Sequence, residues 1–472
     1  MDTTKHELLS TTPANLRLQE SDTTDADRAT PLHKTRHILR ELFGPPEGRT
    51  FAVRYWDGSG EQASAGAVPA FTLVLRHPGA LRRMLYPPSE LGLAEAYLHD
   101  DYDLEGDVEA AVGLLAELSG YFRSPLKSVR LLGYLQALPN GPAPNLRLRA
   151  PTGLRIVGPR HSRARDAAAV RAHYDLSNDF YQLWLDQRMV YSCAYFPTGA
   201  EDLAAAQVAK LDYLCQKLRL QPGERLLDIG CGWGGLMLHA AQHYGAHAVG
   251  ITLSEAQASF ARAQARAAGL EDRCRIELRD YRDLPADARF DKVVSVGMVE
   301  HVGKAKLPDY FAHVYRLTRP GGLFLNHGIV LGAPIAGGLS AWIARTFWRE
   351  GTFIQRYVFP DGELVLPATM VAAAELAGWE TRDLESLREH YALTLRQWVR
   401  RLEAQHEVAC QLVGEQRYRV WRLYMAASAH AFASGQIGIV QLLLSKPDGT
   451  GQTALPLSRA DLYRQHREEA KA

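Results

Sequence analysis

Two kinds of hydrophobic run alternate along the second half of the chain. Short, nearly continuous apolar runs are typical of buried parallel strands, and the longer stretches between them have helical spacing. The expected strands are 225–229, 247–251, 274–279, 291–296 and 322–330. Helices at about 385–409 and 415–434 and a strand at 437–444 follow them. This alternation predicts an α/β domain over residues 167–445, built on a doubly wound, Rossmann-like parallel sheet.

The first half of the chain has a mixed pattern. Residues 1–30 are rich in Thr, Asp and Ser and poor in large apolar groups, which predicts a disordered tail. The elements expected next are a helix at 31–43, strands at 50–56 and 71–76, and helices at 88–98, 108–118 and 127–138. They predict a small α+β domain over 31–138. A basic linker at 139–166 joins the two domains, and residues 446–472 form a polar tail.

Composition agrees with this organisation. A chain of 472 residues is too long for one ordinary core, and 46% hydrophobic with 23% charged residues is typical of a globular protein. Five cysteines without a C-x-x-C pair predict neither a disulfide framework nor a zinc cluster, and favour a reducing, cytoplasmic setting. The N-terminus lacks a signal-peptide pattern. The uncharged run 321–344 contains Asn326, His327 and Pro334, which predicts a buried strand and loop instead of a membrane helix.

The positive charge is concentrated in one region, although the net charge is only +1. Between residues 123 and 171 a single acid, Asp166, faces ten basic residues: Arg123, Lys127, Arg130, Arg147, Arg149, Arg155, Arg160, Arg163, Arg165 and Arg171. A solvated linker is one interpretation. A surface for anionic lipid headgroups is another, because each basic residue near a membrane contributes about 1 kcal/mol. No motif supports a nucleic-acid surface.

The strongest candidate for chemistry is the segment 225–235. Apolar residues of the first strand run into Asp228 and then into three glycines at alternate positions, Gly230, Gly232 and Gly234. A strand, a glycine-rich turn and a helix let a ligand approach the backbone at the helix N-terminus. The G-x-G-x-G spacing favours S-adenosylmethionine over a dinucleotide. Tight packing of the strand against the helix is the structural alternative.

A long aromatic-rich segment follows the strand at 322–330. Residues 331–366 contain Trp342, Phe347, Trp348, Phe353, Tyr357 and Phe359. Long insertions at the carboxyl edge of a parallel sheet often form lids or substrate walls, which predicts a lid-like insertion here. Packing of the same aromatic residues into the core is the alternative.

Several motifs, in order, resemble the cyclopropane-fatty-acyl-phospholipid synthases. They are Tyr174–Tyr181, Tyr191–Phe196, Leu227–Gly235, Gly250–Gln257, Asp280–Asp283, Ser295–Gly303 and Phe353–Gly362. The likeness covers about 165–445 and extends loosely to 53–58 and 95–97. It implies a class I S-adenosylmethionine-dependent methyltransferase domain, and an enzyme that converts the cis double bond of a phospholipid acyl chain into a cyclopropane ring. The basic segment 123–171 predicts peripheral association with the inner face of the membrane, and the resemblance implies a possible homodimer.

The resemblance assigns the cofactor to eleven positions: Tyr191, Ser192, Asp228, Gly230, Gly232, Gly234, Thr252, Leu253, Gln257, Asp280 and Tyr281. Thr252 stands where most such methyltransferases carry an acid for the ribose hydroxyls. Thr252, Leu253 and Gln257 would therefore share the ribose and adenine contacts, with Asp280 and Tyr281 near the adenine.

The resemblance also implies a catalytic set. Methyl transfer to an olefin leaves a carbocation that must lose a proton, and in this family a bound bicarbonate is the base. Its ligands would be Cys193, Glu300, His327, Ile329 and Tyr391. Glu300 and His327 would position the anion and relay its proton, Tyr391 would donate a hydrogen bond, and Cys193 and Ile329 would contribute backbone groups. Taken alone, each of these residues also fits a structural role.

Three departures from the family pattern bear on the acyl pocket: Val299, Asn326 and Ser428. Other functions also stay open. The same olefin could be methylated to a branched methylene chain, which adds the same CH₂. A methyltransferase for a small soluble molecule is disfavoured by the aromatic insertion and the basic linker. A lipid-binding protein without activity is disfavoured by the intact glycine-rich turn.

Overall fold

The computed structural model describes residues 30–64, 68–121, 124–142, 158–174, 176–285, 287–332, 353–453 and 455–462. Several predictions lie outside these residues. They are the tail before Thr30, the insertion between 333 and 352 with Trp342, Phe347 and Trp348, the linker basic residues Arg147, Arg149 and Arg155, and the chain after residue 462.

A seven-stranded sheet forms the C-terminal part, with the order β10-β11-β9-β8-β5-β6-β7. The five predicted strands are confirmed as β5 (Arg225–Ile229), β6 (His247–Thr252), β7 (Cys274–Leu278), β8 (Phe290–Val296) and β9 (Thr318–Leu331), and they run parallel. The predicted last strand is β11 (Ile437–Ser445), antiparallel to β9.

The edge of this sheet differs from the prediction. A polar strand, β10 (Glu380–Ser386), pairs with β11, and its sequence ETRDLES carries no apolar run that would have indicated it. The helix predicted at 385–409 is therefore wrong at both ends. The chain is still in a strand at residue 386, and the helix is divided into α16 (Arg388–Ala404) and α17 (His406–Val413).

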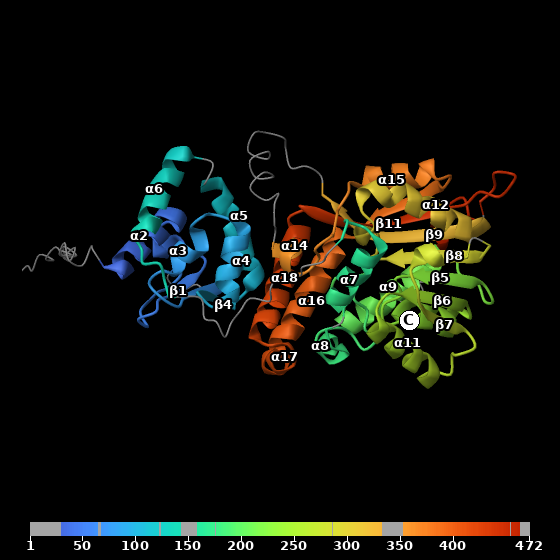
Figure 1. The fold of residues 1–472 in the computed structure, drawn as a ribbon, viewed down its shortest axis with the longest axis horizontal. Helices are drawn as coiled ribbons and strands as arrows, with labels where there is room; N and C mark the ends of the chain where they lie inside the picture. The colour runs from blue at the N-terminus through green and yellow to red at the C-terminus, as the bar shows by residue number, and fades with distance from the viewer. Residues whose placement is uncertain are drawn as a thin grey trace, which may run out of the picture.

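Helices cover both faces of the sheet (Figure 1). They are α9 (Leu203–Lys217), α10 (Gly235–Tyr244) and α11 (Glu255–Ala267) on one face, and α12 (Leu307–Leu317) and α15 (Pro367–Leu376) on the other. Within β5, Leu226 packs into the first of these two cores, whereas Leu227 and Ile229 pack into the second. Successive side chains of a strand point to opposite faces of the sheet. Apolar side chains on both faces of β5 are therefore buried under helices, as in a doubly wound sheet.

The N-terminal part has its own four-stranded sheet, with the order β2-β1-β3-β4. Its strands are β1 (Ala52–Arg54), β2 (Gly60–Glu61), β3 (Phe71–Leu75) and β4 (Tyr102–Gly106). Its helices are α2 (Pro31–Phe43), α3 (Ala80–Leu85), α4 (Glu90–Leu98), α5 (Val108–Tyr121) and α6 (Pro125–Gln136). Sequence reasoning missed β4 and α3, which are both short.

The two sheets are joined by packing as well as by the chain. Helices α16 and α18 (Glu415–Ala433) stand between the N-terminal part and the large sheet (Figure 1). One hydrophobic cluster extends from Ile38 in α2 to Phe432 in α18. Helices α16 and α18 therefore pack against the N-terminal part, which fixes its position beside the seven-stranded sheet. In the described part of the chain, no helix is long and apolar enough to cross a membrane.

Candidate active site

A cavity of about 540 Å³ lies at the carboxyl ends of β5, β6 and β8. Ligands of α/β sheets bind at this edge, and the volume is that of a small-molecule site. Every predicted cofactor residue except Gly234 lines it: Tyr191, Ser192, Asp228, Gly230, Gly232, Thr252, Leu253, Gln257, Asp280 and Tyr281. The fold therefore gathers residues from four separate motifs around one cavity.

The glycine-rich turn has two different functions. Gly230 and Gly232 adopt left-handed backbone angles, with φ of +81° and +54°, and a Cβ added at Gly232 would meet nothing within 4 Å. The wall of the cavity stays open at this point because no side chain fills it. At Gly234 an added Cβ would lie 2.9 Å from the Cβ of Ala261 in α11. Gly234 therefore permits close packing of α10 on α11, which is the structural alternative considered for this motif.

The second strand ends in a buried polar pair. The Thr252 hydroxyl donates to Gln257 Oε1 at 2.7 Å and accepts a hydrogen bond from the Ser254 amide at 3.2 Å. Both side chains are buried and line the cavity. This pair occupies the place that the sequence assigned to the ribose contact, and it presents an amide and a hydroxyl where an acid is usual.

Asp280 is held by a residue that sequence reasoning missed. The Arg282 guanidinium donates to Asp280 at 2.8 and 2.6 Å and to Asp166 at 3.1 Å. These side-chain hydrogen bonds lower the pKa of Asp280 against the effect of burial, so the carboxylate stays ionised. Arg282 and Asp166 also line the cavity. The pattern Asp-Tyr-Arg-Asp at 280–283 was the available signal, because an arginine two residues after an acid can fold back onto it.

Lys210 is a second missed residue. It lies on the inward face of α9, is 2% exposed, and its Nζ donates to Ser192 Oγ at 3.0 Å. Burial lowers the pKa of Lys210 to about 8 and raises the pKa of Asp228 to about 7, while attraction between the two charges opposes both shifts. Lys210 therefore fixes the loop that contains Tyr191 and Ser192 against the floor of the cavity.

The predicted catalytic residues form a separate group, and none of them is among the described residues that line the cavity. The Cys193 thiol lies 3.8 Å from the Leu387 carbonyl, which also accepts the amide of Tyr391. The Leu387 amide donates to Ile439, and Ile439 is paired with Ile329 across β11 and β9. The tertiary structure thus brings together residues from four distant segments.

Glu300 is the carboxylic acid of this group. Its Oε1 accepts the Ile329 amide at 2.6 Å, and its Oε2 has no hydrogen-bond partner among the described residues. Burial raises the pKa of Glu300 to about 7. The Ile329 amide is therefore engaged with the carboxyl group, which it orients.

His327 lies in the middle of β9 and is 1% exposed. Its Nδ1 is 3.4 Å from Gln441 Nε2, and its Nε2 has no hydrogen-bond partner within the described ranges. Burial, with the positive charges of Lys210 and Lys217, holds the pKa of His327 well below its usual range. The imidazole is therefore neutral. Because Gln441 Nε2 can only donate, Nδ1 accepts from it, and the hydrogen on Nε2 can be donated to one further partner.

A cluster of aromatic rings reaches this group at Tyr391. His173, Tyr191, Phe359, Trp421, Tyr181, Trp184, Trp398 and Tyr391 contact one another as ring pairs. Of the predicted aromatic insertion, Phe359 makes a tilted ring contact with His173 and an edge contact with His301, whereas the Tyr357 hydroxyl donates to Glu95 of α4. The Cys193 thiol is fully buried, and burial raises its pKa far above the ordinary value, so it is not a nucleophile.

The sheet order, the glycine-rich turn and the cavity at the strand ends define the class I S-adenosylmethionine-dependent methyltransferase fold. Residues 161–442 match the family model described as mycolic acid cyclopropane synthetase, and the chain belongs to this family. Residues 38–124 match the model of a domain of unknown function.

Three known proteins illustrate the relationship. A probable fatty acid methyltransferase of Pseudomonas putida is 42% identical over 87% of this chain and 96% of its own length. The cyclopropane-fatty-acyl-phospholipid synthase of Escherichia coli K12 is 34% identical over 81% and 89%. The crystal structure of mycolic acid cyclopropane synthase CmaA1 with SAH and CTAB matches with a TM-score of 0.55 and 35% identity, covering 59% of this chain and 98% of that one.

The cavity fits the cofactor of this family. Gly230 and Gly232 leave the wall open, the polar pair of Thr252 and Gln257 ends β6, and Asp228 lies buried on the floor. These residues would hold the amino-acid, ribose and adenine parts of S-adenosylmethionine. The assignment of each residue to one part of the cofactor stays a prediction.

Replacing Gln257 by leucine tests the ribose side. The substitution removes the acceptor of the Thr252 hydroxyl and one polar group of the cavity, and a hydrogen bond of this kind is worth about 1 kcal/mol. We expect the Kd for S-adenosylmethionine to rise about fivefold in isothermal titration calorimetry. Gln264→Leu is the matched control, because Gln264 is exposed on the same helix. Equal losses in both variants would contradict a contact between Gln257 and the cofactor.

Proposed function

We propose that this enzyme converts the cis double bond of an unsaturated phospholipid acyl chain into a cyclopropane ring, using the methyl carbon of S-adenosylmethionine. The observation that carries this proposal is the buried Glu300 carboxyl group. One of its oxygens is held by the Ile329 amide, the other has no partner among the described residues, and its pKa is raised to about 7. Such a group can give or take a proton in a site that excludes water.

When bound, S-adenosylmethionine supplies an electrophilic methyl group to the olefin. The acyl chain then carries a positive charge, and the added carbon must lose one proton before the ring closes. The aromatic cluster that contains Tyr181 and Trp421 suits this step. The π faces of the rings stabilise a cation, and the rings exclude the water that would convert the cation to an alcohol.

We infer that Glu300, His327 and Tyr391 hold a bicarbonate ion as the proton acceptor, with the backbone near Cys193 and Ile329 shaping the site. Glu300 Oε2 and His327 Nε2 are buried atoms without a hydrogen-bond partner in the described structure, so each has capacity for one further hydrogen bond. A carboxyl group with a raised pKa can stay protonated beside an anion and donate to it, where an ionised carboxylate would repel it. These features support the bicarbonate site.

We also propose that the enzyme works at the surface of a bilayer. Helix α6 exposes Leu126 and Val129 at 85% and 69%, next to Lys127 and Arg130. Apolar side chains flanked by basic ones are typical of helices that lie in the membrane interface. The described part of the basic segment is partly neutralised, since Arg165 pairs with Asp361 and Arg163 with Asp283. Its contribution to lipid binding is therefore smaller than its charge count indicates.

A second product is supported by one relative. The Pseudomonas putida protein, 42% identical, is named a probable fatty acid methyltransferase. Loss of a different proton from the same cation would leave a branched methylene chain in place of a ring. The two products have the same mass, so a measurement that distinguishes them must report the chemical environment of the added carbon.

The experiment incubates the full chain with vesicles of a cis-monounsaturated phospholipid and methyl-labelled S-adenosylmethionine, followed by proton NMR of the extracted lipid. Upfield ring-methylene signals are expected. Olefinic methylene signals would identify the branched product with the same site. Cofactor binding without label in the lipid would contradict both and direct the search to soluble acceptors.

A further inference from the structure

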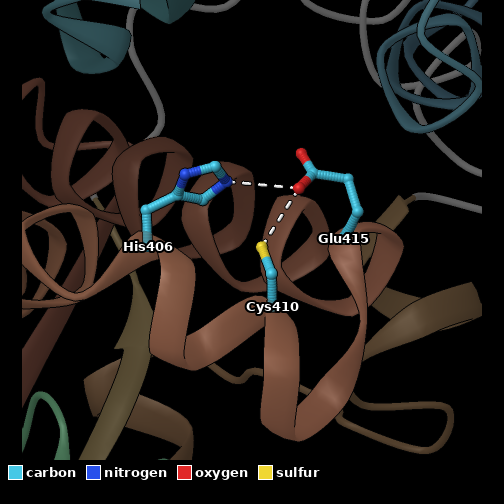
Figure 2. A group of neighbouring side chains, drawn as sticks. All are labelled: His406, Cys410 and Glu415. Carbon is cyan, nitrogen blue, oxygen red and sulfur yellow. Dashed lines mark hydrogen bonds and ion pairs between the residues drawn. The ribbon is translucent and has the colours of Figure 1, made fainter.

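Three side chains with metal-binding atoms meet on helices α17 and α18, outside the cavity (Figure 2). His406 and Cys410 are four residues apart on α17, so they lie on one face of that helix. The chain turns at Gly414, whose φ is +82°, and Glu415 begins α18. The turn brings the Glu415 carboxylate over the same face.

The distances between these atoms are close to those of a tetrahedral site. Glu415 Oε2 lies 3.2 Å from His406 Nε2 and 3.0 Å from Cys410 Sγ, and one ligand atom from each residue lies within 4.8 Å of the others. Zinc binds nitrogen and oxygen at about 2.0–2.1 Å and sulfur at about 2.3 Å, which places neighbouring ligands about 3.3–3.6 Å apart. A small adjustment of side chains is enough to admit an ion.

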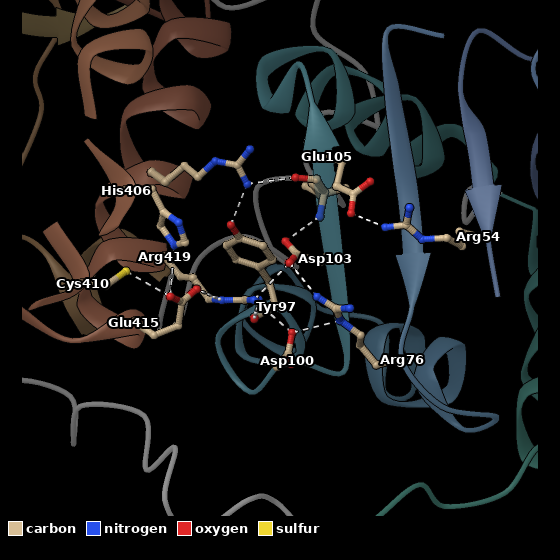
Figure 3. Close-up of polar contacts among 12 residues, drawn as sticks. Arg54, Arg76, Tyr97, Asp100, Asp103, Glu105, His406, Cys410, Glu415 and Arg419 are labelled. Carbon is tan, nitrogen blue, oxygen red and sulfur yellow. Dashed lines mark hydrogen bonds and ion pairs between the residues drawn. The ribbon is translucent and has the colours of Figure 1, made fainter. Parts of the chain in front are cut away.

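The carboxylate is also oriented from behind. Its Oε1 accepts from Arg419 Nε at 2.8 Å, and Arg419 donates further to Asp100 at 2.9 Å, Asp103 at 3.1 Å and the Tyr97 carbonyl at 2.9 Å (Figure 3). Arg419 is 6% exposed, so this anchor is buried. Partners of this kind, which hold a ligand without touching the metal, raise metal affinity.

We propose that His406, Cys410 and Glu415 bind one zinc-type divalent ion, with the fourth position open to water. Nitrogen and sulfur donors select zinc or cobalt over magnesium or calcium. On binding, the Cys410 thiol releases its proton to solvent, and the thiolate and the Glu415 carboxylate together balance the +2 charge. The ion would tie α17 to α18 at the point where Arg419 holds the N-terminal sheet, with a water completing its coordination. Sequence reasoning looked for zinc ligands in C-x-x-C pairs. It therefore missed this cluster, which contains a single cysteine.

Cobalt(II) titration of the metal-free full-length chain tests the site, because a cysteine–cobalt bond has a strong thiolate-to-metal absorption in the near ultraviolet. We expect this band to saturate at one ion per chain and to disappear when zinc is added. Cys410→Ser removes the band. His406→Ala weakens cobalt binding by at least about tenfold, the loss that removal of even an outer partner causes.

Glu407→Gln is the matched control, because Glu407 is an exposed acid on the same helix outside the cluster. It should leave the titration unchanged. Circular dichroism and the melting temperature show whether each variant folds. If Cys410→Ser does not fold, the weaker cobalt binding of His406→Ala provides the test. Absence of the thiolate band at stoichiometric cobalt, or its persistence in folded Cys410→Ser, would overturn the proposal. Neither result bears on methyl transfer.

Discussion

Glu300→Gln is expected to slow product formation about 10²–10⁴-fold, the range for loss of a positioned proton-transfer group. The amide keeps the size of the carboxyl group and can still accept the Ile329 amide, but it cannot give or take a proton at Oε2. The affinity for S-adenosylmethionine should change little, because Glu300 does not line the cofactor cavity. Rates with labelled cofactor and calorimetric Kd values separate the two effects.

The stability of the same variant should respond to pH in a defined direction. The pKa of Glu300 is raised from 4.5 to about 7, so the folded state holds its proton more tightly than the unfolded state. This contribution to stability is fully present below pH 4.5 and is lost as pH rises through 7. One unit of pKa difference corresponds to about 1.4 kcal/mol. The free energy of unfolding of the wild-type protein therefore falls by about 3 kcal/mol over this pH range. Above pH 7, Glu300→Gln should therefore unfold at the same or higher denaturant concentration.

Glu363→Gln provides the control for this prediction. Glu363 is a half-exposed acid whose amide donates to the Glu300 carbonyl, so it is close to Glu300 but outside the buried group. Its replacement should change the rate by less than about twofold, as for a surface charge of small energetic weight. A Glu300→Gln enzyme that loses stability at pH 8 and keeps its rate would show that the carboxyl group is structural.

Gly230→Val is expected to weaken cofactor binding about 10- to 100-fold. The residue has a φ of +81°, and an added Cβ would point at the Met298 side chain at 3.4 Å, on the wall of the cavity. The Cβ alone makes an ordinary contact, so it is the two γ-methyl groups of valine that would crowd the cavity wall. Overpacking costs about 1–3 kcal/mol, which corresponds to that loss of affinity. The left-handed backbone adds about 1–2 kcal/mol of strain to the folded state.

Gly269→Val is the control that distinguishes backbone strain from crowding of the cofactor cavity. Gly269 has a φ of +65° after α11, and an added Cβ would meet nothing within 4 Å. Both variants should lose similar stability in denaturant titrations, whereas only Gly230→Val should lose affinity for S-adenosylmethionine. Similar Kd values for the two variants would be inconsistent with a turn that shapes the cofactor site.

Local sequence patterns determined the parallel sheet and the position of the cofactor turn. Apolar runs such as 225–229 and the glycines after them act within a few residues, so periodicity and backbone freedom were sufficient to predict them. The resemblance of ordered motifs then indicated the cofactor residues that the fold brings to one cavity. The polar strand β10 escaped prediction because it is stabilised by pairing with β11 and not by its own apolar pattern.

Only the tertiary structure decided what surrounds the chemical groups. Burial raises the pKa of Glu300 and lowers that of His327, and burial depends on residues far away in the chain. The hydrogen bond from Lys210 to Ser192 also depends on the tertiary structure, because the packing of α9 brings the two side chains together. The cluster at Glu415 depends on a turn between two helices and on Arg419 reaching the N-terminal sheet. Sequence periodicity carries the fold, whereas electrostatic environments arise from contacts that only the folded chain makes.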